Sequence, residues 1–281
     1  ILMFTRCMGA GGTEKVILQL CDALNDSENK VIVCAASGNG VEKLKEKKIK
    51  YYEIPDIQNK NPGIVINVVE ILLKIIDEEK IDIVHTHHRM AAFYIGMIKK
   101  MRNIKIVNTI HNTFDDKKRL TKFVFDRTEN IAVGNSVFDN MIKYYKVNPQ
   151  NIRVIYNAID NSNVEYEKVD VIEKYAKDFF VIGNIGRINT QKGFEYYVEA
   201  ANIVKKMEYP IKFFIIGDGV LKEKIEDMVE RENLSDVVIF TGFQNNILNI
   251  INKLDLVVLS SLWEGFPLTP IETFSMGKTI V

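Results

Sequence analysis

Two cationic side chains, Arg187 and Lys192, lie five residues apart on a loop that Gly186 and Gly193 bound. The loop directly follows the apolar run Phe179–Ile185, which is typical of a buried β-strand. A fixed guanidinium and a mobile ammonium at this spacing suit the two phosphates of a diphosphate. The alternative is a pair of ordinary loop cations in contact with solvent.

Two glutamates, Glu264 and Glu272, flank the turn into a predicted helix near the end of the chain. We predict that Thr269 caps this helix and that Pro270 occupies its first position. Because two carboxylates at the mouth of an anion site repel each other, a hydroxyl-rich ligand explains the pair better than packing does. Three backbone amides of the turn can donate hydrogen bonds to an anion or to sugar hydroxyls: those of Phe266, Leu268 and Thr269.

Three glycines, Gly9, Gly11 and Gly12, stand between the first predicted strand and the first predicted helix. Glycine lets backbone N–H groups approach a phosphate at a helix N-terminus, where the helix dipole favours an anion. Glu14 occupies the position of the third glycine of the dinucleotide-binding pattern, and no acidic residue ends the second strand to hold a ribose. A nicotinamide cofactor is therefore not expected, and the loop is either a phosphate contact or a plain tight turn.

All four histidines, His85, His87, His88 and His111, lie at or just after the ends of predicted strands. The spacing of the first three suggests a metal, but no cysteine and no evident carboxylate partner lies nearby in the sequence, so no metal site is expected. His111 should project from the end of its strand, either as a hydrogen-bonding or acid–base group or as a structural histidine.

Short β-branched runs alternate with amphipathic stretches along the chain, an order typical of βαβ units around a parallel sheet. In such sheets ligands bind beyond the carboxyl ends of the strands. Strands are predicted at Ile1–Phe4, Lys30–Ala35, Tyr51–Ile54, Ile81–His85, Lys105–Ile110, Asn130–Val133, Phe179–Ile185, Lys212–Ile216, Val237–Phe240 and Asp255–Ser260. Helices are predicted at Thr13–Leu24, Val41–Lys47, Pro62–Glu79, Met90–Met101, Lys118–Phe125, Ser136–Tyr145, Phe194–Met207, Leu221–Glu232 and Asn245–Ile251.

The polar stretch Asn161–Asp178 interrupts this alternation, and we predict two α/β domains, residues 1–158 and 159–281. Lys and Arg balance Asp and Glu at 37 each over the whole chain, so nucleic acid is not an expected partner. The first domain nevertheless holds 24 Lys and Arg against 18 Asp and Glu, and the second holds 13 against 19. A basic first domain can contact anionic lipid, although solvated helix faces are the alternative explanation of its charge.

No run approaches the roughly 18 uncharged apolar residues of a membrane-spanning helix, and the first residues lack the pattern of a signal peptide. The three cysteines, Cys7, Cys21 and Cys34, are odd in number and lack metal-ligand spacing, which favours a reducing, cytoplasmic environment. Both ends of the sequence fall in predicted strands, so we expect the natural protein to continue beyond them.

Several of these motifs, taken together and in order, resemble the GT-B-fold retaining glycosyltransferases of family 4 (glycosyl transferases group 1), and the resemblance covers essentially the whole chain. The motifs are Gly11-Gly12-Thr13-Glu14, Val154–Asp160, Gly186-Arg187 with Lys192-Gly193, Gly217-Asp218-Gly219, Phe240-Thr241-Gly242, and the pair Glu264 and Glu272. The resemblance implies an α/β fold of GT-B type, with two Rossmann-like parallel-sheet domains that face a cleft. The first domain is expected on the acceptor side, and the second is expected to bind the nucleotide sugar. The second domain is expected to be incomplete, because the chain stops at Val281 before the family's last C-terminal segment.

The resemblance also implies roles for individual residues. Its donor contacts are Arg187 and Lys192 on the diphosphate, Glu272 on the ribose, Glu264 on the transferred sugar, and the Gly11 and Gly12 amides near the phosphates. His111 would lie near the sugar and the reaction centre, which makes His111 and Glu264 the catalytic candidates. Base contacts are expected just past Gly242, at Phe243 or Gln244.

The implied activity is transfer of a hexose or N-acetylhexosamine from a nucleotide-diphosphate sugar, with retention of anomeric configuration and without a metal or other cofactor. We expect a UDP-sugar as the donor and a glycan or lipid-linked acceptor in surface-polysaccharide biosynthesis, in the cytoplasm or at the inner face of the plasma membrane. The sequence has no Asp-x-Asp triplet, in agreement with metal independence, and two cations can stabilise a leaving diphosphate. Two other functions stay open: a nucleotide-sugar epimerase of GT-B type and a non-catalytic sugar-nucleotide-binding subunit.

Overall fold

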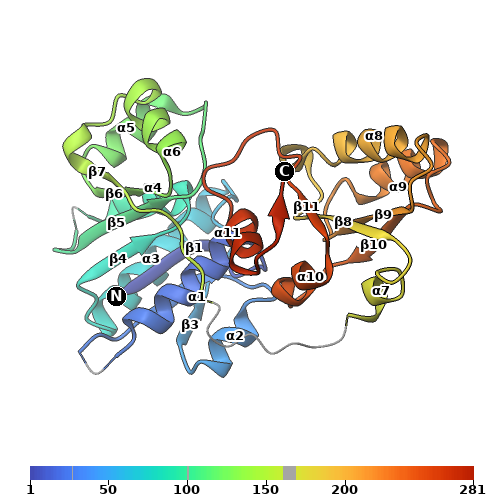
Figure 1. Ribbon diagram of the computed structural model, residues 1–281. Helices are drawn as coiled ribbons and strands as arrows, with labels where there is room; N and C mark the ends of the chain where they lie inside the picture. Colours follow the sequence, from blue (N-terminus) through green and yellow to red (C-terminus); the bar gives the residue numbers. More distant parts are fainter. Residues whose placement is uncertain (27, 100, 161–168) are drawn as a thin grey trace. The chain divides into compact units, whose positions relative to one another are not determined.

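The computed structural model describes residues 1–26, 28–99, 101–160 and 169–281, and this part of the chain forms two compact α/β units (Figure 1). Unit 1 comprises Ile1–Asn157 and unit 2 comprises Ala158–Val281. The division lies one residue from the boundary that we predicted, whereas the roles given to the two domains remain predictions. No helix in the described ranges is both long and apolar enough to cross a membrane.

Unit 1 is built on a seven-stranded parallel sheet in the order β3-β2-β1-β4-β5-β6-β7. Its strands are β1 (Leu2–Cys7), β2 (Ile32–Ala36), β3 (Lys50–Glu53), β4 (Ile83–Thr86), β5 (Lys105–Ile110), β6 (Glu129–Ala132) and β7 (Ile152–Val154). Its helices are α1 (Gly12–Leu24), α2 (Val41–Glu46), α3 (Pro62–Glu78), α4 (Arg89–Ile98), α5 (Lys118–Phe125), α6 (Asn135–Asp139), the π-helical turn η1 (Asn140–Tyr144) and the 3-10 turn η2 (Pro149–Asn151).

Alternate residues of β1 show how both faces of this sheet are covered. Leu2 and Phe4 pack in a core with α3 and α4, whereas Met3 packs in a second core with α1 and α2. Because successive side chains of a strand point to opposite faces, a strand covered on both sides must be apolar throughout. This explains why the run from Leu2 to Phe4 is uniformly apolar and fully buried.

Unit 2 is built on a five-stranded parallel sheet in the order β10-β9-β8-β11-β12. Its strands are β8 (Phe180–Ile185), β9 (Ile211–Ile216), β10 (Val238–Gly242), β11 (Leu256–Val258) and β12 (Thr279–Ile280). Its helices are α7 (Asp170–Glu173), the 3-10 turn η3 (Thr190–Lys192), α8 (Phe194–Lys205), α9 (Lys222–Arg231), α10 (Ile247–Lys253) and α11 (Leu268–Ser275). One core lies between the sheet and α8 and α9, and the other lies between the sheet, α7 and α10.

The order of the strands reverses once in each sheet, between β1 and β4 in unit 1 and between β8 and β11 in unit 2. At such a reversal the connections leave to opposite faces, which opens a crevice at the carboxyl ends of the two strands. The glycine loop follows β1, and His87 and His88 follow β4. Arg187 and Lys192 follow β8, and Glu264 follows β11. The predicted chemistry of each unit therefore lies at its switch point.

The α/β architecture with two parallel sheets is confirmed, and the differences from the predicted elements are local. β7 was not predicted, because it is a three-residue edge strand whose middle residue, Arg153, is exposed. The turn α7 was not predicted either, since it lies in the polar stretch before β8 and buries only Ile172. Part of that stretch, residues 161–168, lies outside the described residues. The predicted helix Ser136–Tyr145 changes from α-helix to π-helix at Asn140.

The start of α11 corrects one prediction. Thr269 does not cap this helix, which begins at Leu268 with Pro267 as its N-cap residue and no side-chain cap. Pro270 is therefore the third helical residue rather than the first. It fits there because the first amides of a helix have no acceptor within it, so the missing N–H of proline costs nothing.

Candidate active site

The loop after β8 brings Lys192 back across the end of the strand. The Lys192 amide donates a hydrogen bond to Asn189 Oδ1 (3.2 Å), which caps the turn η3. A Cβ at Gly186 would stand 3.1 Å from Lys192 Cε, so the stem of the lysine packs directly against the glycine backbone. Arg187 is exposed, and its guanidinium makes no hydrogen bond or ion pair to another residue that the structure describes.

Lys192 and Glu264 form an ion pair, with Nζ 2.7 Å from Oε1. Both side chains are largely buried, with exposed fractions of 18% and 19%. The amide of Gln191 donates to the other oxygen of Glu264 (3.3 Å) and to the carbonyl of Trp263 (2.9 Å). The loops after β8 and β11 therefore meet at Glu264, whose carboxylate has a cation on one oxygen and an amide donor on the other.

Two polar residues that the sequence interpretation missed, Asn184 and Ser260, hold the backbone of Lys192 in place through hydrogen bonds. The Asn184 amide donates to Ser260 Oγ (2.7 Å), and Ser260 Oγ donates to the carbonyl of Lys192 (2.8 Å). Gly193 has a left-handed φ of +57°, and a Cβ there would stand 2.4 Å from the carbonyl oxygen of Ser260. A signal was present in the sequence, because Asn184 is a polar residue in an otherwise apolar strand and buried polar groups need partners.

The loops after β9 and β10 complete the carboxyl edge of the second sheet. Gly217 has a φ of +144°, and a Cβ there would stand 2.0 Å from the carbonyl oxygen of Gly186. The Gly217 amide donates to the carbonyl of Gly242 (2.9 Å), and Phe243, which follows Gly242, is 44% exposed. Gly242 and the base contacts predicted just past it, at Phe243 or Gln244, thus lie in unit 2 next to the loop after β9.

Glu272 is the fifth of the eight residues of α11 and is buried, with an exposed fraction of 5%. Leu268 and Thr269, which precede it by four and three residues, are also buried and share its face of the helix. Phe266 is half-buried in the loop before the helix. The donor contacts predicted for these residues stay predictions.

In unit 1, one amide of the glycine loop already donates a hydrogen bond to the carboxylate of Glu14. Gly11 is the N-cap residue of α1, and its N–H donates to Glu14 Oε2 (3.0 Å). A Cβ at Gly40 would stand 2.7 Å from the carbonyl of Gly9, so the loop after β2 packs closely on the glycine loop. The contact of Gly11 and Gly12 with a phosphate stays a prediction, and at Gly11 it requires Glu14 to release the amide.

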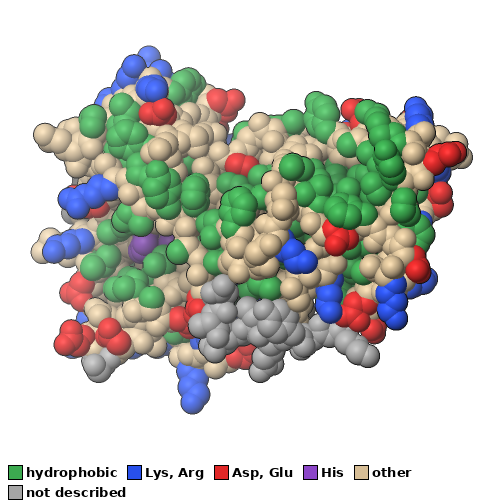
Figure 2. All heavy atoms as spheres, viewed as in Figure 1, with side chains coloured by type: hydrophobic (Ala, Val, Ile, Leu, Met, Phe, Trp, Pro, Cys, Tyr) green, Lys and Arg blue, Asp and Glu red, His purple; other side chains and the backbone are tan. Residues whose placement is uncertain are grey.

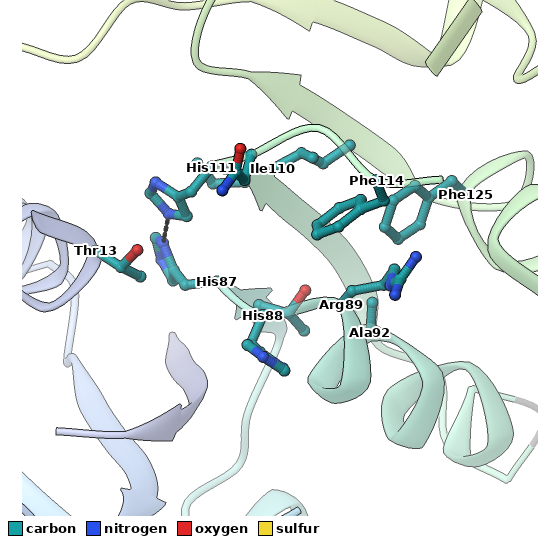
Figure 3. Close-up of a pocket in the computed structure, with 12 residues that line it drawn as sticks. Thr13, His87, His88, Arg89, Ala92, Ile110, His111, Phe114 and Phe125 are labelled. Carbon is teal, nitrogen blue, oxygen red and sulfur yellow. Dashed lines mark hydrogen bonds between the residues drawn. The ribbon is translucent and has the colours of Figure 1, made fainter. Parts of the chain in front are cut away.

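The four histidines gather at the carboxyl ends of β4 and β5, where they make hydrogen bonds of different kinds. His85 Nε2 lies 2.8 Å from Thr109 Oγ1, and His87 Nδ1 lies 3.1 Å from His111 Nε2 (Figure 3). His88 Nδ1 accepts a hydrogen bond from the Met90 amide (3.2 Å) and so caps α4. Among the described residues, no group of three or more His, Cys, Asp or Glu side chains could hold a metal ion.

Burial keeps these imidazoles neutral at neutral pH. It lowers the pKa of His85, His88 and His111 to about 4 and the pKa of His87 well below its usual value. For His87 and His111 the neighbouring histidines lower the pKa further, because a second positive charge nearby would be repelled. A neutral imidazole offers one donor and one acceptor, so the rings that line a cavity are suited to binding neutral polar groups, whereas His85 Nε2 is already bonded to Thr109.

Three of the histidines, His87, His88 and His111, line a cavity of about 230 Å³ in unit 1, together with residues of α1, α4 and the loop after β5 (Figure 3). Arg89, at its wall, stacks 4.2 Å from the ring centre of Phe114, pairs with Asp116 and donates to Tyr145 Oη (3.3 Å). The charge of Arg89 is therefore neutralised within the unit. The sequence interpretation did not identify Arg89, which carries no motif of its own.

Both units match known protein families. Residues 10–163 match Glycosyltransferase Family 4, and residues 166–281 match Glycosyl transferases group 1. The solved structure of Anabaena Alr3699/HepE in complex with UDP-glucose covers 99% of this chain with a TM-score of 0.82, at 19% sequence identity. The chain covers 79% of that structure, and the similarity supports the fold.

Two curated relatives are similar in sequence. The UDP-Gal:alpha-D-GlcNAc-diphosphoundecaprenol alpha-1,3-galactosyltransferase of Escherichia coli is 29% identical over 289 residues, which are 95% of this chain and 74% of the relative. The N-acetylgalactosamine-N,N'-diacetylbacillosaminyl-diphospho-undecaprenol 4-alpha-N-acetylgalactosaminyltransferase of Campylobacter jejuni is 26% identical over 143 residues. These residues are 51% of this chain and 38% of the relative.

Proposed function

The chain belongs to glycosyltransferase family 4, and on this premise we propose that it transfers a hexose or N-acetylhexosamine from a UDP-sugar to a glycan or lipid-linked acceptor. The observation that carries the proposal is the ion pair of Lys192 with Glu264 at the switch point of the second sheet, on the same loop that carries the exposed Arg187. Two cations on adjoining turns suit a diphosphate, and a carboxylate beside them suits sugar hydroxyls.

The donor and acceptor classes are supported by what the relatives are named for. The Escherichia coli relative takes UDP-Gal, and the Anabaena structure holds UDP-glucose. Both sequence relatives are named for acceptors on an undecaprenol diphosphate carrier. We therefore propose uridine as the base, with contacts at Phe243 or Gln244, and a lipid-linked saccharide as the acceptor in surface-polysaccharide biosynthesis.

The proposed reaction needs no metal ion. As the bond between the anomeric carbon and the diphosphate breaks, negative charge develops on the leaving phosphate oxygens. Arg187 is exposed at this edge of the sheet, and Lys192 can move from Glu264 to the phosphates without losing a counter-charge. Glu264, released from the lysine, can then accept hydrogen bonds from the transferred sugar. We propose retention of configuration, with the acceptor entering on the face that the diphosphate leaves.

The acceptor class also suggests contact with a membrane surface. Leu120 and Phe123 of α5 are 46% and 49% exposed, and Arg127 stacks over Phe123 at 4.0 Å. Lys118 lies over the ring of Tyr144 at 4.6 Å. Figure 2 shows apolar and basic side chains together at the α5 end of unit 1. We propose that these five residues, the α5 surface, rest on anionic lipid at the cytoplasmic face of the membrane.

The direct test is calorimetric titration with UDP, GDP, ADP and dTDP in the presence of EDTA. We expect UDP to bind selectively, and Arg187→Ala and Glu272→Ala each to weaken its binding by about tenfold or more, because each removes a charge-assisted hydrogen bond. Arg231→Ala is the matched control, since Arg231 is an exposed arginine at the far end of α9 in the same unit.

If no diphosphate binds, or if the three variants behave alike, the proposed donor site is wrong. Incubation with UDP-galactose and UDP-glucose then tests the chemistry. Transfer to an added octyl N-acetylglucosaminide supports the proposal, and NMR of the product reports its anomeric configuration. Release of an epimerised sugar nucleotide without transfer would overturn the proposal in favour of the epimerase.

A further inference from the structure

His87 differs from the other histidines in having a fully buried ring nitrogen without a hydrogen-bond partner in the described part of the chain. Its exposed fraction is 3%, and Nε2 makes no hydrogen bond to any residue in the described part of the chain. Buried polar atoms are nearly always paired, so an unpaired one at the wall of a cavity calls for an explanation. His87 lines the 230 Å³ cavity of unit 1, and Figure 3 shows its ring between His111 and Thr13.

The position of the His87 ring follows from the sheet. His85 and His87 are two residues apart, so they project from the same face of β4 and its extension, and their ring centres lie 4.2 Å apart. The His87 amide donates to the carbonyl of Phe4 (3.0 Å), which keeps the backbone in register with β1 beyond the last residue of β4. The ring is therefore held by the sheet rather than by a loop.

The hydrogen bond between His87 and His111 couples the protonation of the two rings. When His87 Nδ1 carries the proton, it donates the hydrogen bond to His111 Nε2, and His87 Nε2 is unprotonated and can only accept. When His111 Nε2 carries the proton, it donates the hydrogen bond to His87 Nδ1, and His87 Nε2 then carries a proton and is a donor. A group bound at His87 Nε2 thus selects the tautomer of His111.

The surroundings of the cavity favour a neutral, hydroxyl-bearing ligand. A hydroxyl can both donate and accept, so it satisfies His87 Nε2 in either tautomer. An anion is disfavoured because Arg89, the one cation among the described lining residues, already pairs with Asp116. The lining combines apolar side chains, Ala92 and Ile110, with polar ones, as the C–H and O–H groups of a sugar ring require.

We propose that His87 binds a sugar hydroxyl through Nε2 and, through Nδ1, positions His111 in the ring orientation and tautomer that the site needs. This inference rests on the proposed function, since it takes the sugar to be that of the donor or of the acceptor. His87 is then a binding residue for the sugar and a positioning residue for His111.

Two amide substitutions separate the two contacts. The amide of asparagine reaches the place of Nδ1 only, whereas the amide of glutamine reaches the place of Nε2 only. His87→Asn should keep the contact with His111 and raise the KM of the sugar substrate about tenfold, as expected for loss of one buried hydrogen bond. His87→Gln should keep KM near that of the wild type and lower kcat, because the His111 ring is no longer fixed.

His85→Gln is the matched control. His85 is buried beside His87, but its Nε2 is already bonded to Thr109, and it does not line the cavity. We expect KM and kcat close to the wild type in this variant. Circular dichroism and thermal unfolding of all three variants exclude a general loss of folding, and UDP alone should bind each of them as it binds the wild type.

The assay also identifies the source of the hydroxyl. A rise in the KM of UDP-galactose or UDP-glucose during hydrolysis, without acceptor, assigns the contact to the donor sugar. A rise confined to the KM of the octyl N-acetylglucosaminide assigns it to the acceptor.

Imidazole ¹⁵N spectra give a readout that does not depend on turnover. Saturation with the sugar substrate should move the Nε2 resonance of His87, whereas its persistence at the shift of the free protein would overturn the proposal. Equal kinetics of His87→Asn and the wild type would also overturn it, with Nε2 then bonded to water alone. If the wild type itself binds and turns over no UDP-sugar, the proposed function fails instead.

Discussion

Lys192 and Glu264 hold one another at the switch point of unit 2. Their separation of 2.7 Å and exposed fractions below one fifth place the pair between a surface salt bridge and a fully buried one. Removing one partner leaves the other charge partly desolvated, and this costs more than losing the attraction alone. The pair therefore has two consequences: it stabilises the loops after β8 and β11, and it keeps a lysine ready for an anionic ligand.

We expect Lys192→Met and Glu264→Gln each to lower the free energy of unfolding by about 1–3 kcal/mol, with the double variant losing less than the sum. A double-mutant cycle by urea denaturation measures the coupling. The control is the pair of Lys224 with Glu195 in the same unit, whose lysine side chain is 62% exposed, and we expect its coupling to be below about 1 kcal/mol. Equal coupling in the two cycles would contradict this interpretation.

The histidines make unit 1 sensitive to acid. Burial lowers the pKa of His85 from 6.5 to about 4. Between these pH values His85 is protonated in the unfolded chain and neutral in the folded chain. The free energy of unfolding is therefore highest, as far as His85 contributes to it, above pH 6.5. It falls as the pH approaches 4, by up to about 1.4 kcal/mol per pH unit for each such histidine. Urea unfolding of the wild type and of His85→Gln at several pH values should give a shallower decline in the variant, and parallel curves would exclude the effect.

At the scale of the elements, the glycines after the strands of unit 2 allow the loops to pack against one another. Gly193 and Gly217 both have positive φ, and a Cβ on either would clash with a backbone carbonyl of a neighbouring loop. Gly242 and Gly277 also have positive φ, but no atom lies within 4 Å of their Cβ positions. Gly193 and Gly217 are thus required both by their positive φ and by the lack of space for a Cβ. Gly242 and Gly277 are required by their positive φ alone.

This difference gives a matched comparison. Gly193→Ala should lower the free energy of unfolding by about 3 kcal/mol or more, because it adds a clash with Ser260 to the strain of a left-handed residue. Gly277→Ala should cost only about 1–2 kcal/mol, since it adds the backbone strain alone. Chemical denaturation of both variants tests the comparison, and equal losses would show that the loop carbonyl can move away.

At the scale of the whole molecule, charge is distributed unevenly between the two halves of the sequence. Residues 1–158 carry 24 Lys and Arg against 18 Asp and Glu, whereas residues 159–281 carry 13 against 19. The α5 surface combines this basic excess with exposed apolar side chains. Unit 2 also exposes two apolar side chains close together in the sequence, Ile203 of α8 and Met207 just after this helix, by 58% and 56%.

We expect the protein to bind vesicles of phosphatidylglycerol and phosphatidylcholine in equal amounts, and to be released by salt. Leu120→Ser with Phe123→Ser should weaken this binding by about tenfold or more, because both apolar anchors are lost. Ile203→Ser with Met207→Ser is the control of similar exposed area, which we expect to leave binding unchanged. Co-sedimentation measures the bound fraction, and equal loss in both double variants would mean that the α5 surface is not the contact.

The sequence by itself determined the class of fold and the places of most elements. Runs such as Lys105–Ile110 and Lys118–Phe125 have the bounds in the structure that their patterns predicted, because periodicity reports which faces are buried. It also placed the candidate residues after the strands, since parallel strands gather their carboxyl ends at one edge. The pattern missed β7 and α7 and misplaced the start of α11, because these segments are short or polar.

Only the tertiary structure decided which of these residues meet. The pairing of Lys192 with Glu264 joins positions that are 72 residues apart, and that of His87 with His111 joins positions 24 apart. Neither contact follows from local pattern, because each depends on which strand lies next to which and on the register between them. The unpaired Nε2 of His87 has the same origin: a sequence shows that a histidine is present, but only packing shows which of its nitrogens is left without a partner.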